Sequence, residues 1–453
     1  MILKQFKTPG LPHFSYLIGA GKEAAVIDPQ IDLEQYLQLA QDEGLVIRHI
    51  FETHRNEDFV TGAKKLSDVT GAKVWHGPNP DGPIEYAETA DEGTEVDIGS
   101  LKLKVLKTPG HTDDSISIAI FDTEYSEGAV GVFTGDALFI GDVGRTDFYE
   151  GQEKEKAGLL YDSLQKLMGL GDQAILYPAH GAGSVCGSGM AAREFSTIGH
   201  ERANNPRLQL SRDEFVKAKA SEHHYQPPYF RLMEELNLHG GHECDAPASI
   251  PVLGLAQLCE TKPDVVLDVR DPTSHLGGHI SGSVCLPIGM IAAFGGWFLN
   301  EKTKIGLVAE SADQARDAVR HLCRIGFTNI VGAVTGVLGM ASGGADTDFI
   351  ATVDTGSVAS RVRQSSDNWV LLDVRSIDEF ESGHIQGALH AYVGEILKDP
   401  ERFVTPEGVT VMCGSGARAS LAASALKAAG QKGLDVYVGS IGAWRSAGKP
   451  VVC

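Results

Sequence analysis

The amino-acid sequence predicts an α/β protein of about three domains. Three observations support this fold class: the length of 453 residues, alternating strand-like and helix-like segments over the first 200 residues, and an internal repeat in the second half. A chain of this length exceeds what one hydrophobic core usually organises, because domains of about 100–150 residues are the most common.

The first half contains an expected strand pair at 15–28 that turns at Gly19–Gly21, and an expected helix at 33–43. Further apolar, strand-like runs are found at 47–53, 101–106, 115–121, 131–133 and 174–177. Polar loops that contain His or Asp follow several of these strands, at 53–59, 108–112, 134–139 and 177–181. Functional side chains commonly lie on loops at strand ends, so we expect these four loops to converge.

The first of these loops reads His54-x-Asn56-x-Asp58-Phe59. Together the four loops resemble the metallo-β-lactamase superfamily over residues 1–240, which implies an αββα domain there. That superfamily usually has His-x-His-x-Asp-His at this position. Phenylalanine cannot bind a metal, and the amide of Asn56 is a poor substitute for an imidazole. A two-zinc site is therefore disfavoured.

The ligands that survive are His54, His111 and Asp136. This set resembles the persulfide dioxygenase branch, as does the segment Gly-Arg-Thr-Asp-Phe at 144–148. The resemblance implies one Fe(II) per chain, since two His and one carboxylate leave open positions on ferrous iron. By the same motifs we expect Asp58 and His180 to orient a ligand or water. Arg145 is expected either to anchor a substrate carboxylate or to form a structural ion pair.

The second half repeats a pattern after 105 residues. Val-Val-Leu-Asp-Val-Arg at 265–270 reappears as Val-Leu-Leu-Asp-Val-Arg at 370–375, and Gly-His-Ile at 278–280 reappears at 383–385. We therefore predict two copies of one domain, at 250–342 and 362–453. The stretches at 221–250 and 341–360 are expected to connect the domains.

Only the later copy has a cysteine after the strand expected near 409–412. Cys413 begins a Gly-rich turn, Arg418 follows, and an Ala-rich helix is expected at 417–429. Backbone N–H groups at such a turn stabilise a thiolate. The pattern Cys-x-x-Gly-x-Arg resembles the rhodanese active-site loop, which implies two α/β domains with central parallel sheets. Glu310, or a neighbour, replaces the nucleophile in the earlier copy, which we predict to be inactive.

Cys186 lies in a Gly-rich stretch after His180 and is either a reactive thiol or a structural cysteine. In the multidomain dioxygenase–sulfurtransferases that this stretch resembles, a cysteine here lies near the iron. The other five cysteines have no comparable surroundings. Because the cysteines are few and scattered and residues 1–12 lack a signal-peptide pattern, we expect reduced thiols in the cytoplasm.

The net charge of −21 makes nucleic acid an unexpected partner, because nucleic-acid binders present a basic face. No apolar run reaches the roughly 20 residues that cross a bilayer, so no membrane partner is expected. Low-molecular-weight thiol persulfides of the glutathione or coenzyme A type, O₂ and sulfite are the expected partners. A homo-oligomer is compatible with the sequence.

These features predict an Fe(II) persulfide dioxygenase coupled to a thiosulfate-forming sulfurtransferase in sulfide detoxification. One alternative is a zinc-dependent thioester hydrolase of the glyoxalase II type, fused to a rhodanese sulfur carrier. Another is a non-catalytic sulfur carrier or sensor whose first domain has lost its metal.

Overall fold

The computed structural model of the chain describes residues 1–80, 82–125, 128–184, 187, 189–241, 249–364 and 368–453. The chain divides into two compact units. Unit 1 holds residues 1–226 and 230–245, and unit 2 holds residues 227–229 and 246–453. No helix among the described residues is both long and apolar enough to span a membrane.

Unit 1 contains two six-stranded sheets. The first has the order β1-β2-β3-β4-β5-β6, formed by Ile2–Lys7, Phe14–Ala20, Glu23–Ile27, Val46–Glu52, Lys73–His76 and Glu88–Thr89. The second has the order β12-β11-β10-β9-β8-β7, formed by Ser196–Thr197, Ile175–Pro178, Ala129–Gly135, Ile116–Asp122, Leu101–Lys107 and Glu95–Ile98.

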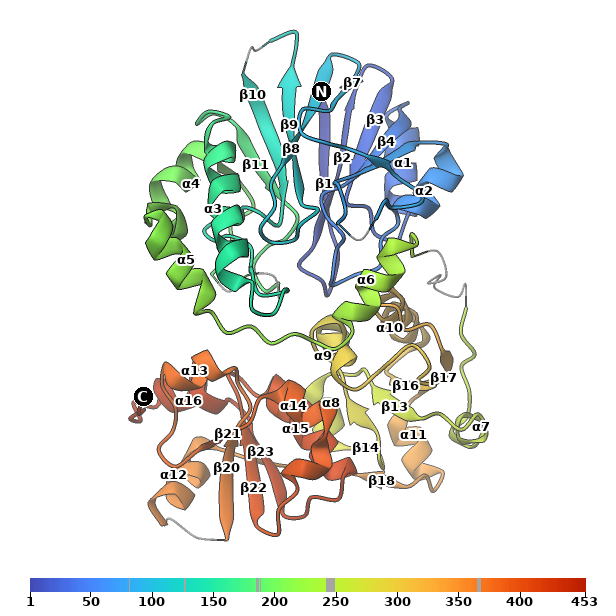
Figure 1. Cartoon of the computed structure of the whole chain (residues 1–453). Helices are drawn as coiled ribbons and strands as arrows, with labels where there is room; N and C mark the ends of the chain where they lie inside the picture. Colours follow the sequence, from blue (N-terminus) through green and yellow to red (C-terminus); the bar gives the residue numbers. More distant parts are fainter. Residues whose placement is uncertain (81, 126–127, 185–186, 188, 242–248, 365–367) are drawn as a thin grey trace. The chain divides into compact units, whose positions relative to one another are not determined.

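Side chains that alternate along the strands build three apolar layers in unit 1. In β2, Tyr16 and Ile18 belong to the core that both sheets share, whereas Leu17 packs with helices α1 (Glu34–Asp42) and α2 (Ala63–Thr70). On the second sheet, Val132 belongs to an outer core with helix α3 (Glu153–Met168) and helix α5 (Arg212–Ala220). Figure 1 shows α1 and α2 on one side of the paired sheets and α3, α4 (Ile198–Asn204) and α5 on the other. The predicted αββα architecture is confirmed.

Unit 2 contains two parallel sheets, one for each copy of the repeat. The earlier copy has the order β15-β13-β16-β17, formed by Val284–Cys285, Val265–Asp268, Ile305–Ala309 and Ile330–Thr335. The later copy has the order β19-β23-β22-β20-β21, formed by Ala351–Val353, Leu434–Tyr437, Gly408–Met412, Trp369–Asp373 and Leu389–His390. The predicted pair of α/β domains with central parallel sheets is therefore confirmed.

The two copies pack directly against each other. Helix α15 (Ala417–Ala428) of the later copy is buried throughout residues 419–426 and contacts β15 of the earlier copy. The backbone N–H of Cys285 donates to the hydroxyl of Ser424 in this contact (2.9 Å). The earlier copy therefore covers the helix that follows Cys413.

Both expected connectors contain regular structure. Helix α6 (Phe230–Leu238) lies within 221–250, and residues 242–248 are outside the described chain. Strands β18 (Thr347–Asp348) and β19 lie within 341–360 and pair with β14 (His279–Ile280) and β23. The sequence did not indicate these two strands because they have only two and three residues, too few for a pattern, and each pairs with a strand that is distant in the sequence. The domain limits 1–240, 250–342 and 362–453 stay a prediction.

Candidate metal centre and thiol site

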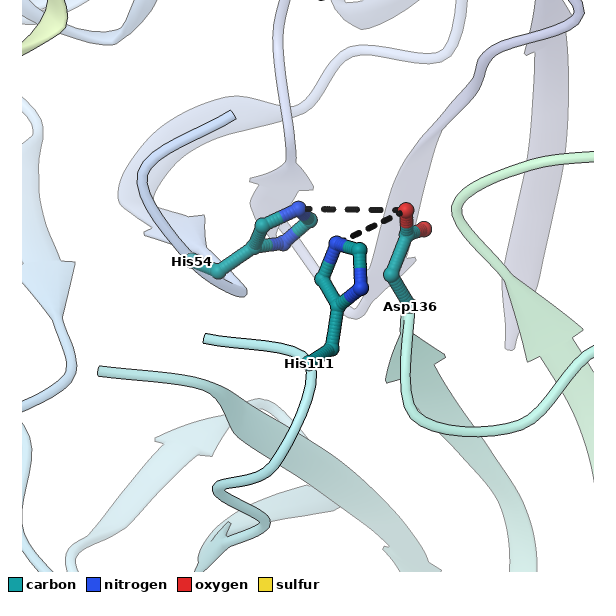
Figure 2. A group of neighbouring side chains, drawn as sticks. All are labelled: His54, His111 and Asp136. Atoms are coloured by element: carbon teal, nitrogen blue, oxygen red, sulfur yellow. Dashed lines mark ion pairs between the residues drawn. The ribbon is translucent and has the colours of Figure 1, made fainter. Parts of the chain in front are cut away.

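The structure brings together three of the residues predicted to bind iron. His54 follows β4, His111 lies after β8, and Asp136 follows β10. One ligand atom from each lies within 4.8 Å of the other two. The Nε2 atom of His111 is 3.4 Å from Oδ2 of Asp136, and that of His54 is 4.0 Å from the same oxygen. Figure 2 shows both rings and the carboxylate facing one point.

These three atoms are buried, and none makes a hydrogen bond to any described part of the chain. Burying polar atoms without a partner costs free energy, so such a cluster needs a compensating ligand. A divalent cation would bind to all three atoms at once. Two imidazoles and one carboxylate are donors that suit iron or zinc. The residues present therefore fit a metal ion.

Hydrogen bonds set the tautomers of both histidines. The Thr53 hydroxyl donates to Oδ2 of Asp28 (2.9 Å) and therefore accepts from Nδ1 of His54 (2.9 Å). The Nδ1 of His111 donates to the backbone carbonyl of Arg145 (3.0 Å). With the ring proton on Nδ1, each Nε2 keeps its lone pair for a metal, which is the form that a metal ligand needs.

His180 forms hydrogen bonds with two carboxylates, one of which is the candidate ligand Asp136. Its Nδ1 is 2.6 Å from Oδ1 of Asp136, and its Nε2 is 3.0 Å from Oδ2 of Asp58. Burial alone would lower the pKa of His180, but Asp136 and Asp58 raise it well above its usual value. Burial would raise the pKa of Asp136, but the neighbouring His180 lowers it. His180 thus favours the ionised Asp136 carboxylate that a cation requires, and Asp58 contacts the other nitrogen of the same ring.

The two substituted positions, Asn56 and Phe59, contact groups other than the three candidate ligand atoms. The Asn56 amide donates to the carbonyl of His54 (3.3 Å). The Phe59 ring packs against His13 in a tilted arrangement, with centroids 4.1 Å apart and an interplanar angle of 42°.

Two site residues, Glu57 and Asn237, were missed by the reasoning from the sequence. Oε1 of Glu57 lies 3.2 Å from Nε2 of His111, and Oε2 lies 3.6 Å from Nε2 of His54. Burial would lower the pKa of His54, but the neighbouring carboxylate of Glu57 raises it to about 9. Asn237, in α6, holds the loop after His54: it donates to the carbonyls of Asn56 (2.6 Å) and Phe59 (2.8 Å). A sequence signal existed for Glu57, three residues after His54, but none for Asn237.

Arg145 is fully buried and forms a two-pronged ion pair with Asp147, with N···O distances of 2.6 and 2.7 Å. Its guanidinium also lies over the Phe148 ring, 4.9 Å from the centroid. This is the geometry of the structural ion pair, one of the two roles that the sequence left open. Cys186 lies outside the described residues.

Cys413 follows β22 directly, and its sulfur accepts a hydrogen bond from the backbone N–H of Gly416 at 3.1 Å. Arg418, in the first turn of α15, pairs with Glu379 at 2.6 and 2.8 Å. Burial would raise the pKa of Glu379, but the hydrogen bonds from Arg418 lower it to about 2. This arrangement places an N–H donor and a fixed cation at the start of the helix that follows the thiol.

In the earlier copy, Glu310 directly follows β16, as Cys413 follows β22. Glu310 is exposed, so a carboxylate occupies the nucleophile position. Another cysteine of this copy, Cys285, is buried, and burial raises the pKa of its thiol far above the ordinary value. A protonated thiol is a poor nucleophile, so the earlier copy lacks a reactive cysteine at both positions.

The chain matches two known domain families. Residues 8–180 match the metallo-β-lactamase superfamily, and residues 254–338 and 359–447 match the rhodanese-like domain. The mitochondrial persulfide dioxygenase ETHE1 of Bos taurus is 31% identical over 233 residues, which is 48% of this chain and 80% of that protein. The hydroxyacylglutathione hydrolase GloC of Haemophilus influenzae is 27% identical, over 41% of this chain and 88% of that protein.

A solved metallo-β-lactamase structure from Staphylococcus aureus is 30% identical and has a TM-score of 0.67. It covers 74% of this chain, and the match spans 99% of that protein. A match of this extent reaches beyond the metal-binding domain. The chain therefore belongs to the persulfide dioxygenase family of the metallo-β-lactamase superfamily, and rhodanese-like domains follow its metal-binding domain.

Proposed function

We propose that the chain oxidises low-molecular-weight thiol persulfides to sulfite at a single iron and converts sulfite to thiosulfate at Cys413. The observation that carries this proposal is the buried convergence of His54, His111 and Asp136 in the same chain as a rhodanese-type thiol. Substrates of the glutathione or coenzyme A type would connect the protein to sulfide detoxification.

The proposed reactions balance as follows. A thiol persulfide, O₂ and water give the thiol, sulfite and two protons, so the outer sulfur is oxidised and O₂ is reduced. Cys413 then takes the outer sulfur from a second persulfide, which releases a second thiol. Sulfite attacks this sulfur, the S–S bond to Cys413 breaks, and thiosulfate leaves while the cysteine is regenerated.

The residues of the first site have separate tasks in this proposal. His54, His111 and Asp136 would hold the iron, which when bound supplies open positions for the persulfide sulfur and O₂. Thr53 and the carbonyl of Arg145 keep the ring protons on Nδ1. His180 keeps the Asp136 carboxylate ionised and oriented.

At the second site, the Gly416 N–H stabilises the sulfur anion of Cys413. Arg418 adds positive charge, and its pair with Glu379 fixes the guanidinium. Together they favour both the thiolate and the anionic persulfide.

The test begins with protein purified without oxygen. We expect about one iron per chain, O₂ uptake on adding glutathione persulfide, and thiosulfate as the product. Two zinc ions per chain and thioester hydrolysis without O₂ uptake would instead support a hydrolase. Absence of bound iron, together with absence of O₂ uptake, would contradict the dioxygenase.

A Cys413→Ser variant separates the two reactions. We expect unchanged O₂ uptake but release of sulfite in place of thiosulfate, because serine cannot carry sulfane sulfur. Unchanged thiosulfate output would show that Cys413 does not perform the second step.

A further inference from the structure

Ser440 has an unusual backbone conformation next to Cys413. Its φ is +50°, and only two other non-glycine residues in the described chain, Asp28 and Lys262, have positive φ. This region is strained for residues that have a Cβ, and glycine adopts it at little cost. Strained residues often cluster at functional sites, so the retention of serine needs a reason.

The Ser440 side chain supplies that reason. Its hydroxyl is fully buried and accepts a hydrogen bond from the backbone N–H of Cys413 at 3.0 Å. It donates to the carbonyl of Tyr437 at 2.8 Å and lies 3.9 Å from the Cys413 sulfur. Glycine would satisfy the backbone, but it would leave the Cys413 N–H without this partner.

Residues 439–442 also bind the active-site turn through the backbone. The N–H groups of Gly439, Ile441 and Gly442 donate to the carbonyls of Ser415 (3.2 Å), Cys413 (3.1 Å) and Gly414 (3.1 Å), respectively. Three successive carbonyls of the turn are thereby hydrogen-bonded to residues 439–442. The turn can then present N–H groups to the sulfur, as Gly416 does.

We propose that Ser440 is a positioning residue for sulfur transfer, whose hydroxyl fixes the backbone of Cys413 so that the turn binds a sulfur anion. This inference rests on the proposed role of Cys413. Its chemical basis is a buried hydroxyl that both accepts from the nucleophile's own N–H and lies beside the sulfur.

Two variants separate the effect of losing the Ser440 hydroxyl from the effect of relieving the backbone strain. Ser440→Ala removes the hydroxyl and keeps the Cβ, whereas Ser440→Gly removes both. Ser424→Ala is the matched control: Ser424 is also buried, and its hydroxyl accepts a hydrogen bond from the backbone N–H of Cys285 and donates to the carbonyl of Leu421. Thermal unfolding, alkylation of Cys413 by iodoacetamide resolved by peptide mass spectrometry, and thiosulfate formation from glutathione persulfide and sulfite are measured for each.

We expect both Ser440 variants to alkylate at Cys413 about tenfold more slowly than the wild type, because the thiolate is the reactive form. We expect kcat for thiosulfate to fall by a similar factor with little change in KM for sulfite. Ser440→Gly should unfold at a higher temperature than Ser440→Ala, yet show the same loss, and Ser424→Ala should retain both rates.

Wild-type rates in either Ser440 variant would overturn the proposal. Unfolding of both variants below the assay temperature would also overturn it, since the hydroxyl would then serve stability alone. If wild-type protein forms no thiosulfate, the proposed function fails, while the alkylation comparison still decides whether Ser440 positions Cys413.

Discussion

A non-glycine residue with positive φ lies next to each candidate site. Asp28 has a φ of +48°, and its carboxylate accepts from the backbone N–H of Thr53 (2.7 Å) and from the Thr53 hydroxyl (2.9 Å). Ser440 likewise has positive φ, and its hydroxyl accepts a hydrogen bond from the backbone N–H of Cys413. Such conformations cost about 1–3 kcal/mol each and persist where the surroundings determine them. At this scale, a residue with positive φ hydrogen-bonds to the neighbour of His54 and another to Cys413.

Thr53→Val should weaken iron binding by about 10–100-fold, because Nδ1 of His54 loses the oxygen that fixes its tautomer. Iron affinity is measured by competition with a chelator. Thr410→Val is the matched control, since it removes another buried Thr–Asp hydrogen bond, to Asp435 (2.6 Å), in unit 2. Equal iron affinity in the two variants would show that the hydrogen bonds from His54 to Thr53 and from Thr53 to Asp28 do not affect iron binding.

The pair of Glu379 and Arg418 predicts a pH dependence. Because the folded pKa of Glu379 is lowered to about 2 from 4.5, the pair stabilises the fold fully above about pH 4.5. This contribution is lost as the pH falls towards 2. We expect Glu379→Gln to unfold at lower urea than wild type at pH 7, with a difference that narrows below pH 4.5. A difference that stays constant down to pH 3 would contradict this assignment.

At the scale of elements, the candidate metal ligands lie on loops that follow strands, and helix α6 hydrogen-bonds to one of these loops. The loops after β4, β8 and β10 were visible in the sequence because apolar runs end at polar motifs. Helix α6 was not visible as a site element. Asn237 on α6 reaches back across the sequence to the loop of His54, where it also accepts from the N–H of Thr61 (2.8 Å).

Asn237→Ala should reduce iron affinity by about tenfold or more, because three buried backbone groups lose their partner and the loop of His54 loosens. Asn205→Ala provides the comparison: Asn205 is a buried asparagine of the same unit that donates to the carbonyl of Asp142 (3.1 Å). Both variants should lose stability, but only Asn237→Ala should lose iron. Wild-type iron affinity in Asn237→Ala would exclude a role for α6 in the metal centre.

At the scale of the whole molecule, the earlier copy of the repeat packs against the later copy. The Trp297 ring of the earlier copy meets Tyr392 of the later copy edge-on, with centroids 5.5 Å apart. A Cβ at Gly394 would come within 2.5 Å of the same indole, so glycine is required there. The earlier copy thus contributes a buried aromatic contact to the packing of the later copy.

Trp297→Ala should destabilise unit 2 by about 3–5 kcal/mol, the usual cost of deleting a buried aromatic side chain. Near the unfolding temperature of unit 2, thiosulfate formation by the variant should fall because unit 2 is less stable. Iron content and O₂ uptake should stay at the wild-type level. Leu338→Ala, at a side chain that is 86% exposed, should change neither property. Unfolding of Trp297→Ala at the wild-type temperature would show that this contact contributes little.

The sequence by itself predicted the fold classes, the convergence of His54, His111 and Asp136, and the loss of the nucleophile in the earlier copy, at Glu310 or a neighbour. These features depend on local patterns: apolar periodicity, motif spacing and the replacement of one residue type by another. Only the tertiary structure revealed Glu57, Asn237 and Ser440, and the ion pair of Arg145 with Asp147. The physical reason is that a side chain's direction and its partner are set by packing between segments far apart in the chain, which local patterns do not encode.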